Sequence, residues 1–477
     1  MPCSGKWTGC DLTQSDALFA EPFGQYAAEF CIELAADVYQ MNTAQWKNAG
    51  FGDFSFLEGN KLLTGSKQGM ENSVWQTLTG NVLQQMAKLR IFALNPFAQM
   101  QGIRREDGEQ NNCKALFFMK GCCVYIAFMG SGKLLSDWAY NIRINRKNGI
   151  HEGFLTLTED VLGHAADIAF PDHAKELGLP RLTLQDILED LCNKNGKFRL
   201  LCTGHSRGGA VAQIFLDLLM KKGADKARMR GVTFAAPSVY DAMYCAADIP
   251  CVNLLFDDDL VPFSGADRHG GSMLSLYPDE PLIQSVYGEW AQDTCFREIR
   301  QMLSAIRSVK SLIVFLFVLV DLLKKAPGGL LNELLNTLPA SASRYIEGKK
   351  GDLLDGMKKR LEKNWQELYG SQPLPRGEKI FWKTGLDKLI ARYSASQVIK
   401  CLSKAIFMPH KLCRKQEDDL GPSGYLYMVT EGFDRLHASH DGDLNNALCV
   451  ASRREIKTVK HKPLNRYCPL RTGRRSR

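Results

Sequence analysis

The chain has 477 residues, of which 45% are apolar, 23% charged and 9% aromatic. Since an ordinary domain takes roughly 100 to 200 residues, this length allows two or three domains, or one large domain with insertions. The composition lies in the globular range and excludes a disordered, collagen-like or disulfide-stapled miniature protein.

The formal net charge of +8 comes from the C-terminal end of the sequence. Residues 452–477 hold ten Lys and Arg against one acid, Glu455, so this tail carries +9 and the rest of the chain carries −1. The body is therefore close to neutral, and nucleic acid is not a favoured partner. We expect a solvated tail, with an anionic lipid surface as the alternative contact.

Two features favour a reducing, cytoplasmic location. Residues 1–11 contain no apolar stretch of the length that a secretory signal needs. The fifteen cysteines are scattered, and Cys122, Cys123 and Cys202 lie in apolar runs, which is typical of reduced core thiols. No paired C-x-x-C spacing is present, so we expect neither a zinc site nor a cofactor.

Apolar runs predict alternating strands and helices in the middle of the chain. Residues 114–128 form two apolar runs parted by Lys120 and Gly121, the pattern of two neighbouring strands. Further along, strands are expected at 198–203, 231–236 and 251–256, with a helix at 209–220. This order predicts an α/β fold with a largely parallel sheet covered by helices.

The segment from about 283 to 415 is rich in Leu, Lys, Glu and Ala and predicts helices. Residues 352–368 have apolar positions three and four apart, so this helix is amphipathic and needs a partner surface. Residues 312–320 are nine consecutive apolar residues, too few to span a membrane. We expect the helix at 311–325 to be buried in an inserted subdomain, or alternatively to dip into one leaflet of a membrane.

The strongest chemical signal is the sequence GHSRGG at residues 204–209. It has the G-x-S-x-G form and lies between a predicted strand and a predicted helix, where small flanking residues tolerate a tight turn that exposes the serine. The following helix N-terminus favours negative charge. Ser206 is therefore a candidate nucleophile, and His205, held within the turn and pointing away from Ser206, is expected to be structural.

A serine at neutral pH needs a histidine to accept its proton and a carboxylate to orient that histidine. Asp257, Asp258 and Asp259 follow the strand predicted at 251–256, at the sheet edge where such a carboxylate would lie. On the residues alone, all three aspartates are candidates.

Five blocks of sequence together resemble the class 3 lipase family, the fungal triacylglycerol lipase type of α/β-hydrolase. The stretch from Phe128 to Ser131 with the following Asp137-Trp138 pair is similar to F-R-G-[ST] and D-W of that family, and GHSRGG contains its serine motif. The remaining matches are HEGF at 151–154, TFAAP at 233–237 and DLVP at 259–262.

The resemblance implies an α/β-hydrolase and assigns roles to several residues. It selects Asp259 as the carboxylate that orients the base, and it implies that the backbone amides of Ser131 and Arg207 form the oxyanion hole. Two residues depart from the family pattern: Met129 replaces the usual arginine, and Arg207 replaces an apolar residue and brings a bulky charge beside the hole. No metal is implied.

The general base must be one of three downstream histidines, His410, His437 and His440. In the family, the base follows a P-x-G-x-Y-like strand and begins a helix. Residues 422–427 match that strand, which makes His440 the predicted base and leaves His437 as its rival.

These observations predict a serine hydrolase of lipid carboxylic esters, either acylglycerols or phospholipids, working through Ser206, His440 and Asp259. The 311–325 helix and the basic tail are candidate contacts with a membrane or droplet surface. The alternative is a non-catalytic lipase-like scaffold that binds a partner. The expected divisions are an extension at 1–27, a hydrolase domain at 28–282 and 416–451, a helical insertion at 283–415 and a basic tail at 452–477.

Overall fold

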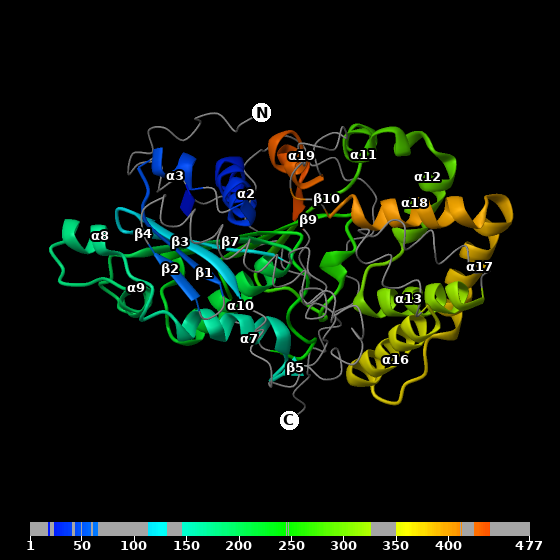
Figure 1. Ribbon diagram of the computed structural model, residues 1–477, viewed down its shortest axis with the longest axis horizontal. Coiled ribbons are helices and arrows are strands. Elements are labelled where there is room, and N and C mark those ends of the chain that lie inside the picture. The colour runs from blue at the N-terminus through cyan, green and yellow to red at the C-terminus, as the bar shows by residue number, and fades with distance from the viewer. Residues whose placement is uncertain are drawn as a thin grey trace, which may run out of the picture.

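The computed structural model describes residues 18–19, 23–40, 43–48, 50–58, 61–64, 113–130, 146–325 except 245 and 247, 350–410, 412 and 424–438. Its main feature is a nine-stranded sheet, counted within those residues, in the order β11-β10-β9-β8-β7-β4-β3-β1-β2 (Figure 1). The strands are β1 (Gly52–Glu58), β2 (Lys61–Thr64), β3 (Lys114–Lys120), β4 (Cys123–Phe128), β7 (Arg199–His205), β8 (Met229–Phe234), β9 (Cys251–Phe256), β10 (Ser272–Leu276) and β11 (His437–Ala438). A separate two-stranded hairpin joins β5 (Arg146–Lys147) and β6 (Ile150–His151).

The centre of the sheet is parallel and its edges are antiparallel. Strands β4, β7, β8, β9 and β10 pair in parallel, whereas β1, β2 and β3 at one edge and β11 at the other pair antiparallel. Parallel strands must be buried on both faces, which explains the apolar run of β4 and the largely apolar β9, whose one polar residue is the buried Asn253. The expected strands and the α/β-hydrolase fold are confirmed.

The two faces of the sheet are packed against different helices. Tyr125 and Ala127 of β4 belong to the core beneath α2 (Gln25–Gln40), whereas Val124 and Ile126 belong to the core beneath α10 (Arg207–Lys221). This alternation follows from the period of two in a strand. The α10 side also carries α7 (Glu152–Gly163) and α9 (Leu184–Leu191), while α3 (Ala44–Asn48) and α8 (Pro171–Glu176) lie near the β1 edge.

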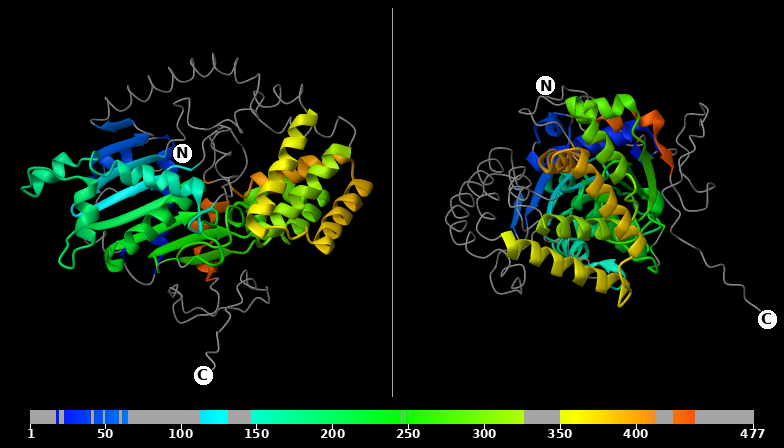
Figure 2. Two further views of the ribbon diagram at one scale, coloured as in Figure 1. Left: turned by 90° about the horizontal axis from the view of Figure 1, so that it is seen from below. Right: turned by 90° about the vertical axis from the view of Figure 1, so that its right-hand side faces the viewer.

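The chain from β10 onward is mainly helical, in the segment predicted to be an insertion. Figures 1 and 2 show most of these helices gathered at one end of the molecule, beyond the β10 side of the sheet. They are nevertheless continuous with it, because one apolar cluster runs from α2 and the sheet into these helices. The helices are α11 (Glu280–Tyr287), α12 (Thr294–Leu303), α13 (Val309–Lys325), α16 (Lys350–Tyr369), α17 (Arg376–Arg392), α18 (Ala395–Phe407) and α19 (Gly424–Thr430).

Helix α13 is buried, which corrects the membrane role considered for 311–325. Val314 and Phe315 are fully buried, and Phe317 is 4% exposed. The Phe315 ring meets Trp382 of α17 edge to face at 5.2 Å, so the partner of this apolar helix is the rest of the helical region. Within the described residues, no helix has both the length and the apolar character needed to cross a bilayer.

The family pattern predicted a strand at residues 422–427. In the structure, residues 424–430 form helix α19. Its buried positions are Gly424, Tyr425, Met428 and Val429, a spacing of three and four that fits one face of a helix. The strand prediction for this part of the chain is therefore wrong. Residues 422 and 423 lie outside the described part.

Candidate active site

Ser206 lies at the turn between β7 and α10, where the backbone is strained. Its φ of 56° and ψ of −128° are unusual for a residue with a side chain. The turn is held by the Ser206 N–H, which donates to the Phe234 carbonyl at 2.9 Å. The turn lies at the carboxyl end of β7, where the sequence predicted it. Ser206 itself is only 5% exposed, so the expected exposure of the serine is not seen.

The glycines around Ser206 are required by close packing. A Cβ on Gly204 would lie 2.4 Å from the backbone of Gly208, and a Cβ on Gly208 would lie 2.0 Å from the carbonyl oxygen of Phe128. These distances leave no room for any side chain. The motif therefore brings β4, β7 and the first turn of α10 together at Ser206.

Each of the three aspartates after β9 has a different partner. Asp257 accepts from the guanidinium of Arg307 at 2.8 Å, and Asp258 pairs with Arg300 of α12 at 2.7 Å. Asp258 also accepts from the Tyr287 hydroxyl at 2.8 Å, and its burial raises its pKa despite the nearby Arg300. These contacts tie the loop to the helical region.

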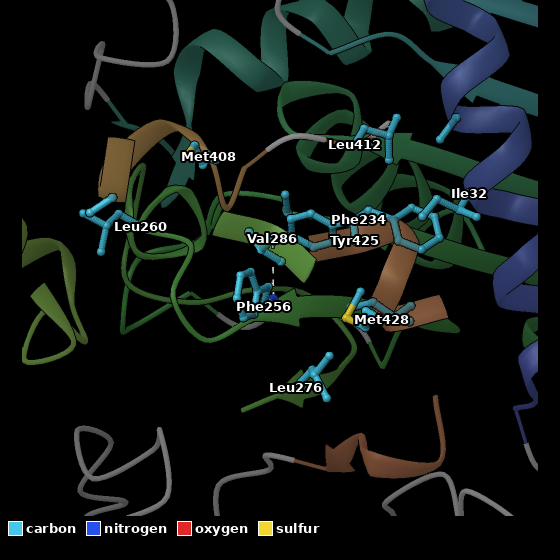
Figure 3. Packing of buried hydrophobic residues seen from close by; sticks show 14 of the residues in the cluster. Ile32, Phe234, Phe256, Leu260, Leu276, Val286, Met408, Leu412, Tyr425 and Met428 are labelled. Atoms are coloured by element: carbon cyan, nitrogen blue, oxygen red, sulfur yellow. Dashed lines mark hydrogen bonds between the residues drawn. The ribbon is translucent and has the colours of Figure 1, made fainter. Parts of the chain in front are cut away.

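Asp259, the third of these aspartates, contacts an imidazole. Its Oδ2 accepts from His410 Nδ1 at 2.9 Å and from the Tyr425 hydroxyl at 2.6 Å, while Oδ1 accepts from the Val261 N–H at 2.9 Å. The Asp259 side chain is fully buried. Tyr425 extends from α19 toward β9, and its oxygen also accepts from the Phe256 N–H at 3.3 Å (Figure 3).

His410 also lies next to the serine turn. Its carbonyl oxygen accepts from Nε2 of His205, the residue before Ser206, at 3.0 Å, and the two imidazole rings are 4.7 Å apart. Because Nδ1 faces Asp259, the other ring nitrogen, Nε2, is left to serve a serine hydroxyl. His410 follows α18, at the end of the predicted insertion.

The other two histidines considered as bases are placed differently. His440, the predicted base, lies outside the described residues. The backbone of His437 lies in β11, where it pairs with Ser275 at the edge of the sheet. The histidine that contacts Asp259 in the structure is therefore His410. The family pattern had favoured His440 and His437 over it.

The two predicted oxyanion donors are Ser131 and Arg207. Ser131 lies outside the described residues, whereas Arg207 begins α10 directly after the serine. The long Arg207 side chain is only 2% exposed, and its guanidinium donates to the Gly130 carbonyl at 3.1 Å. The charge that departs from the family pattern is therefore directed into the protein, toward the strand end that precedes Ser131.

Two polar groups away from the serine have structural roles. His151 caps α7 by accepting from the Phe154 N–H at 3.4 Å. At the contact of α12 with α18, ligand-type atoms of Asp293, Cys295 and Cys401 lie within 4.8 Å of one another. Asp293 caps α12 through the Phe296 N–H at 2.9 Å, which accounts for the carboxylate without an ion.

The sequence reasoning missed the part played by Tyr425 and gave His410 too little weight. One local signal was present at His410. Pro409, which cannot continue a helix, lies just after the apolar-periodic run of α18 and directly before His410. Tyr425 lies in the segment predicted as a strand, and its contact with Asp259 was not predicted.

Comparison with known proteins finds a family similarity in the part of the chain that contains Ser206 and Asp259. Residues 129–266 match the family described as Lipase (class 3). No curated protein matches the chain. The match begins at the residue before Gly130 and ends after Asp259, so it includes the serine motif and stops well before His410.

Several solved lipases are similar at low identity. Native Rhizomucor miehei lipase in its propeptide complex is 16% identical, with 44% of this chain and 70% of that chain covered and a TM-score of 0.26. A deletion mutant of that complex is 18% identical, with 36% of this chain and 53% of that chain covered and a TM-score of 0.25. This chain therefore spans about half of that protein's length. Lipase II from Rhizopus niveus is 17% identical, with 35% of this chain and 62% of that chain covered and a TM-score of 0.25.

The family match supports a lipase-type hydrolase. The similarity to the class 3 lipase family is thus carried by residues 129–266 of this chain.

Proposed function

We propose that this protein hydrolyses carboxylic esters of lipids, with Ser206 as the nucleophile, His410 as the general base and Asp259 as the carboxylate that orients His410. The observation that carries the proposal is the 2.9 Å contact of His410 Nδ1 with buried Asp259, beside the strained turn that bears Ser206. His410 takes the place of His440 in this proposal because of that contact.

The proposed reaction has two stages. His410 Nε2 accepts the proton of the Ser206 hydroxyl as the oxygen attacks the ester carbonyl, and the same proton then passes to the departing alcohol. Water, activated by His410 in the same way, releases the fatty acid from the acyl-enzyme. Asp259 stabilises the imidazolium that forms in both stages, and Tyr425 and Val261 hold the carboxylate in place.

Negative charge on the substrate oxygen needs hydrogen-bond donors. We propose the backbone amides of Arg207 and Ser131 for this role, because Arg207 is the first residue of α10, where the helix dipole favours an anion. The substrate class, acylglycerol or phospholipid, follows from the family rather than from a described cavity.

A fluorophosphonate probe tests the proposal, because phosphonylation requires an activated serine. We expect the purified protein to be labelled and Ser206→Ala to be unlabelled with an unchanged far-UV circular dichroism spectrum. Loss of the serine should reduce ester hydrolysis by on the order of 10⁴-fold or more. A folded wild-type protein that takes no label would overturn the proposal and favour a non-catalytic scaffold.

A further inference from the structure

Besides the contact of its ring with Asp259, His410 is reached by a chain of hydrogen bonds that ends at its backbone carbonyl. The Tyr39 hydroxyl of α2 lies 3.1 Å from His205 Nδ1, and His205 Nε2 lies 3.0 Å from the carbonyl oxygen of His410. His205 is 6% exposed. Three segments far apart in sequence therefore meet through one imidazole beside the nucleophile.

Elementary hydrogen-bond chemistry fixes the direction of both bonds. A carbonyl oxygen can only accept, so His205 Nε2 must carry the proton. Burial, reinforced by the nearby His410, holds the pKa of His205 well below its usual range, and its ring is therefore neutral. Nδ1 then has a lone pair and accepts from the Tyr39 hydroxyl, so Tyr39 stabilises the tautomer that the His410 carbonyl requires.

The backbone of His410 needs such a support. His410 lies in a turn just after α18 and not within a helix or strand. Asp259 holds one ring nitrogen, but a ring hinged on one contact can still swing with its backbone. The bond from His205 fixes that backbone and fixes it to the residue adjacent to Ser206.

We infer that Tyr39 and His205 are positioning residues that set the distance between the base and the nucleophile. His205 holds the His410 backbone, and Tyr39 keeps the Nε2–H tautomer of His205 in place. The inference rests on the proposed function of Ser206 and His410. Small displacements of catalytic groups are costly, since an error of about 1 Å can reduce a rate by roughly 10²-fold.

Four variants test the inference. Tyr39→Phe removes only the hydroxyl that stabilises the Nε2–H tautomer of His205. His205→Gln keeps a donor at a similar reach to Nε2 but has no tautomers, and His205→Met removes the donor. The fourth variant combines Tyr39→Phe with His205→Gln. Tyr244→Phe is the matched control, because it also removes a tyrosine hydroxyl that bonds a buried group, Asp217, at 2.7 Å, away from the site.

The measurements are the rate of fluorophosphonate labelling, kcat and KM for a p-nitrophenyl ester, and the melting temperature. We expect Tyr39→Phe to lower kcat and the labelling rate about tenfold, with KM and the melting temperature little changed. In the His205→Gln background, Tyr39→Phe should change the rates less than about twofold. His205→Met should lose at least as much rate as Tyr39→Phe, and Tyr244→Phe should behave as wild type.

Two results would overturn the inference while leaving the proposed function intact. One is a labelled wild type with a Tyr39→Phe variant that reacts equally fast. The other is an equal loss from Tyr39→Phe in both backgrounds, which would mean that Tyr39 acts on the neighbouring Gly130 strand end and not through His205. A wild type without label overturns both the inference and the proposed function.

Discussion

Ser206 and His410 reach the same site from two regions of the molecule that are built differently. Ser206 is placed by a strand, a turn and a helix within a few residues, and the strain in that turn is supported by the parallel sheet. His410 is placed by helices α11 to α18, which leave the sheet after β10 and return to it 151 residues after Asp259. The first arrangement can be read from a short motif, whereas the second depends on long-range packing.

The largest test of this comparison is the identity of the base. His410→Ala should lower kcat by on the order of 10⁴-fold, about as much as Ser206→Ala, because triad members act as a unit. His440→Ala and His437→Ala should keep most of the activity. A dead His440→Ala variant beside an active His410→Ala variant would show that the helical region does not supply the base.

The next test removes part of the core of the helical region. Phe315→Ala should lower the free energy of unfolding by about 3–5 kcal/mol, because Phe315 is fully buried against Trp382. Phe381→Ala is the control: Phe381 contacts the same Trp382 but is 53% exposed, so its loss should cost less than about 1 kcal/mol.

Activity measurements sharpen the result for Phe315→Ala. If the helices deliver His410, hydrolysis of a short-chain ester and of liposomal substrate should fall together as the variant loses stability. Selective loss on liposomes with an unchanged melting temperature would restore the membrane role considered for residues 311–325.

A smaller effect is expected where the two regions are joined. Arg300→Met leaves the 4% exposed Asp258 side chain without its cation and should cost about 2–3 kcal/mol in urea unfolding. Adding Asp258→Asn should recover part of this loss. Arg392→Met removes an exposed pair with Glu298 on the same helix, α12, and should change stability by less than about 1 kcal/mol. An equal loss of unfolding free energy in Arg300→Met and Arg392→Met would mean that the Arg300–Asp258 pair stabilises the protein no more than an exposed ion pair does.

The smallest test concerns the sheet side and uses pH. His269 Nε2 donates to the Ala236 carbonyl at 2.8 Å, and burial lowers the pKa of His269 to about 4. Between pH 6.5 and 4 the unfolded chain therefore binds a proton that the folded chain does not, so stability falls as the pH drops through that window. His269→Gln keeps the donor and cannot titrate.

Urea unfolding at several pH values between 4 and 7 measures this contribution. The wild type should lose up to about 1.4 kcal/mol more per pH unit than His269→Gln. Parallel pH profiles for the two proteins would contradict the assignment of a buried, neutral His269.

The sequence predicted the sheet and the tight turn at Ser206 well because both depend on local patterns. Buried parallel strands need uninterrupted apolar runs, and the turn at Ser206 needs small residues at fixed offsets. The three consecutive aspartates could not be told apart by their local sequence. Their contacts are with Arg300, Arg307 and His410, which come from the helical region further along the chain.

The sequence ranked His410 below His437 and His440 because Pro409, the local feature beside it, marks a helix end and says nothing about catalysis. The family pattern directed attention to a strand before the histidine, but residues 424–430 form a helix whose Tyr425 reaches back to Asp259. An insertion changes which segment arrives at the site, and spacing learned from compact relatives then fails. The structure provides what the pattern lacked, namely which histidine touches the carboxylate.

The separation of 151 residues between Asp259 and His410 has a consequence for folding kinetics. Joining two points that far apart costs about 4 kcal/mol of loop-closure entropy, and the cost is offset only after the intervening helices have packed. Regain of catalytic activity should therefore be a late event during refolding, after most of the far-UV circular dichroism signal has returned. A nascent or proteolytically trimmed chain that ends before α18 would retain every recognisable lipase motif and yet lack the histidine proposed to activate its serine.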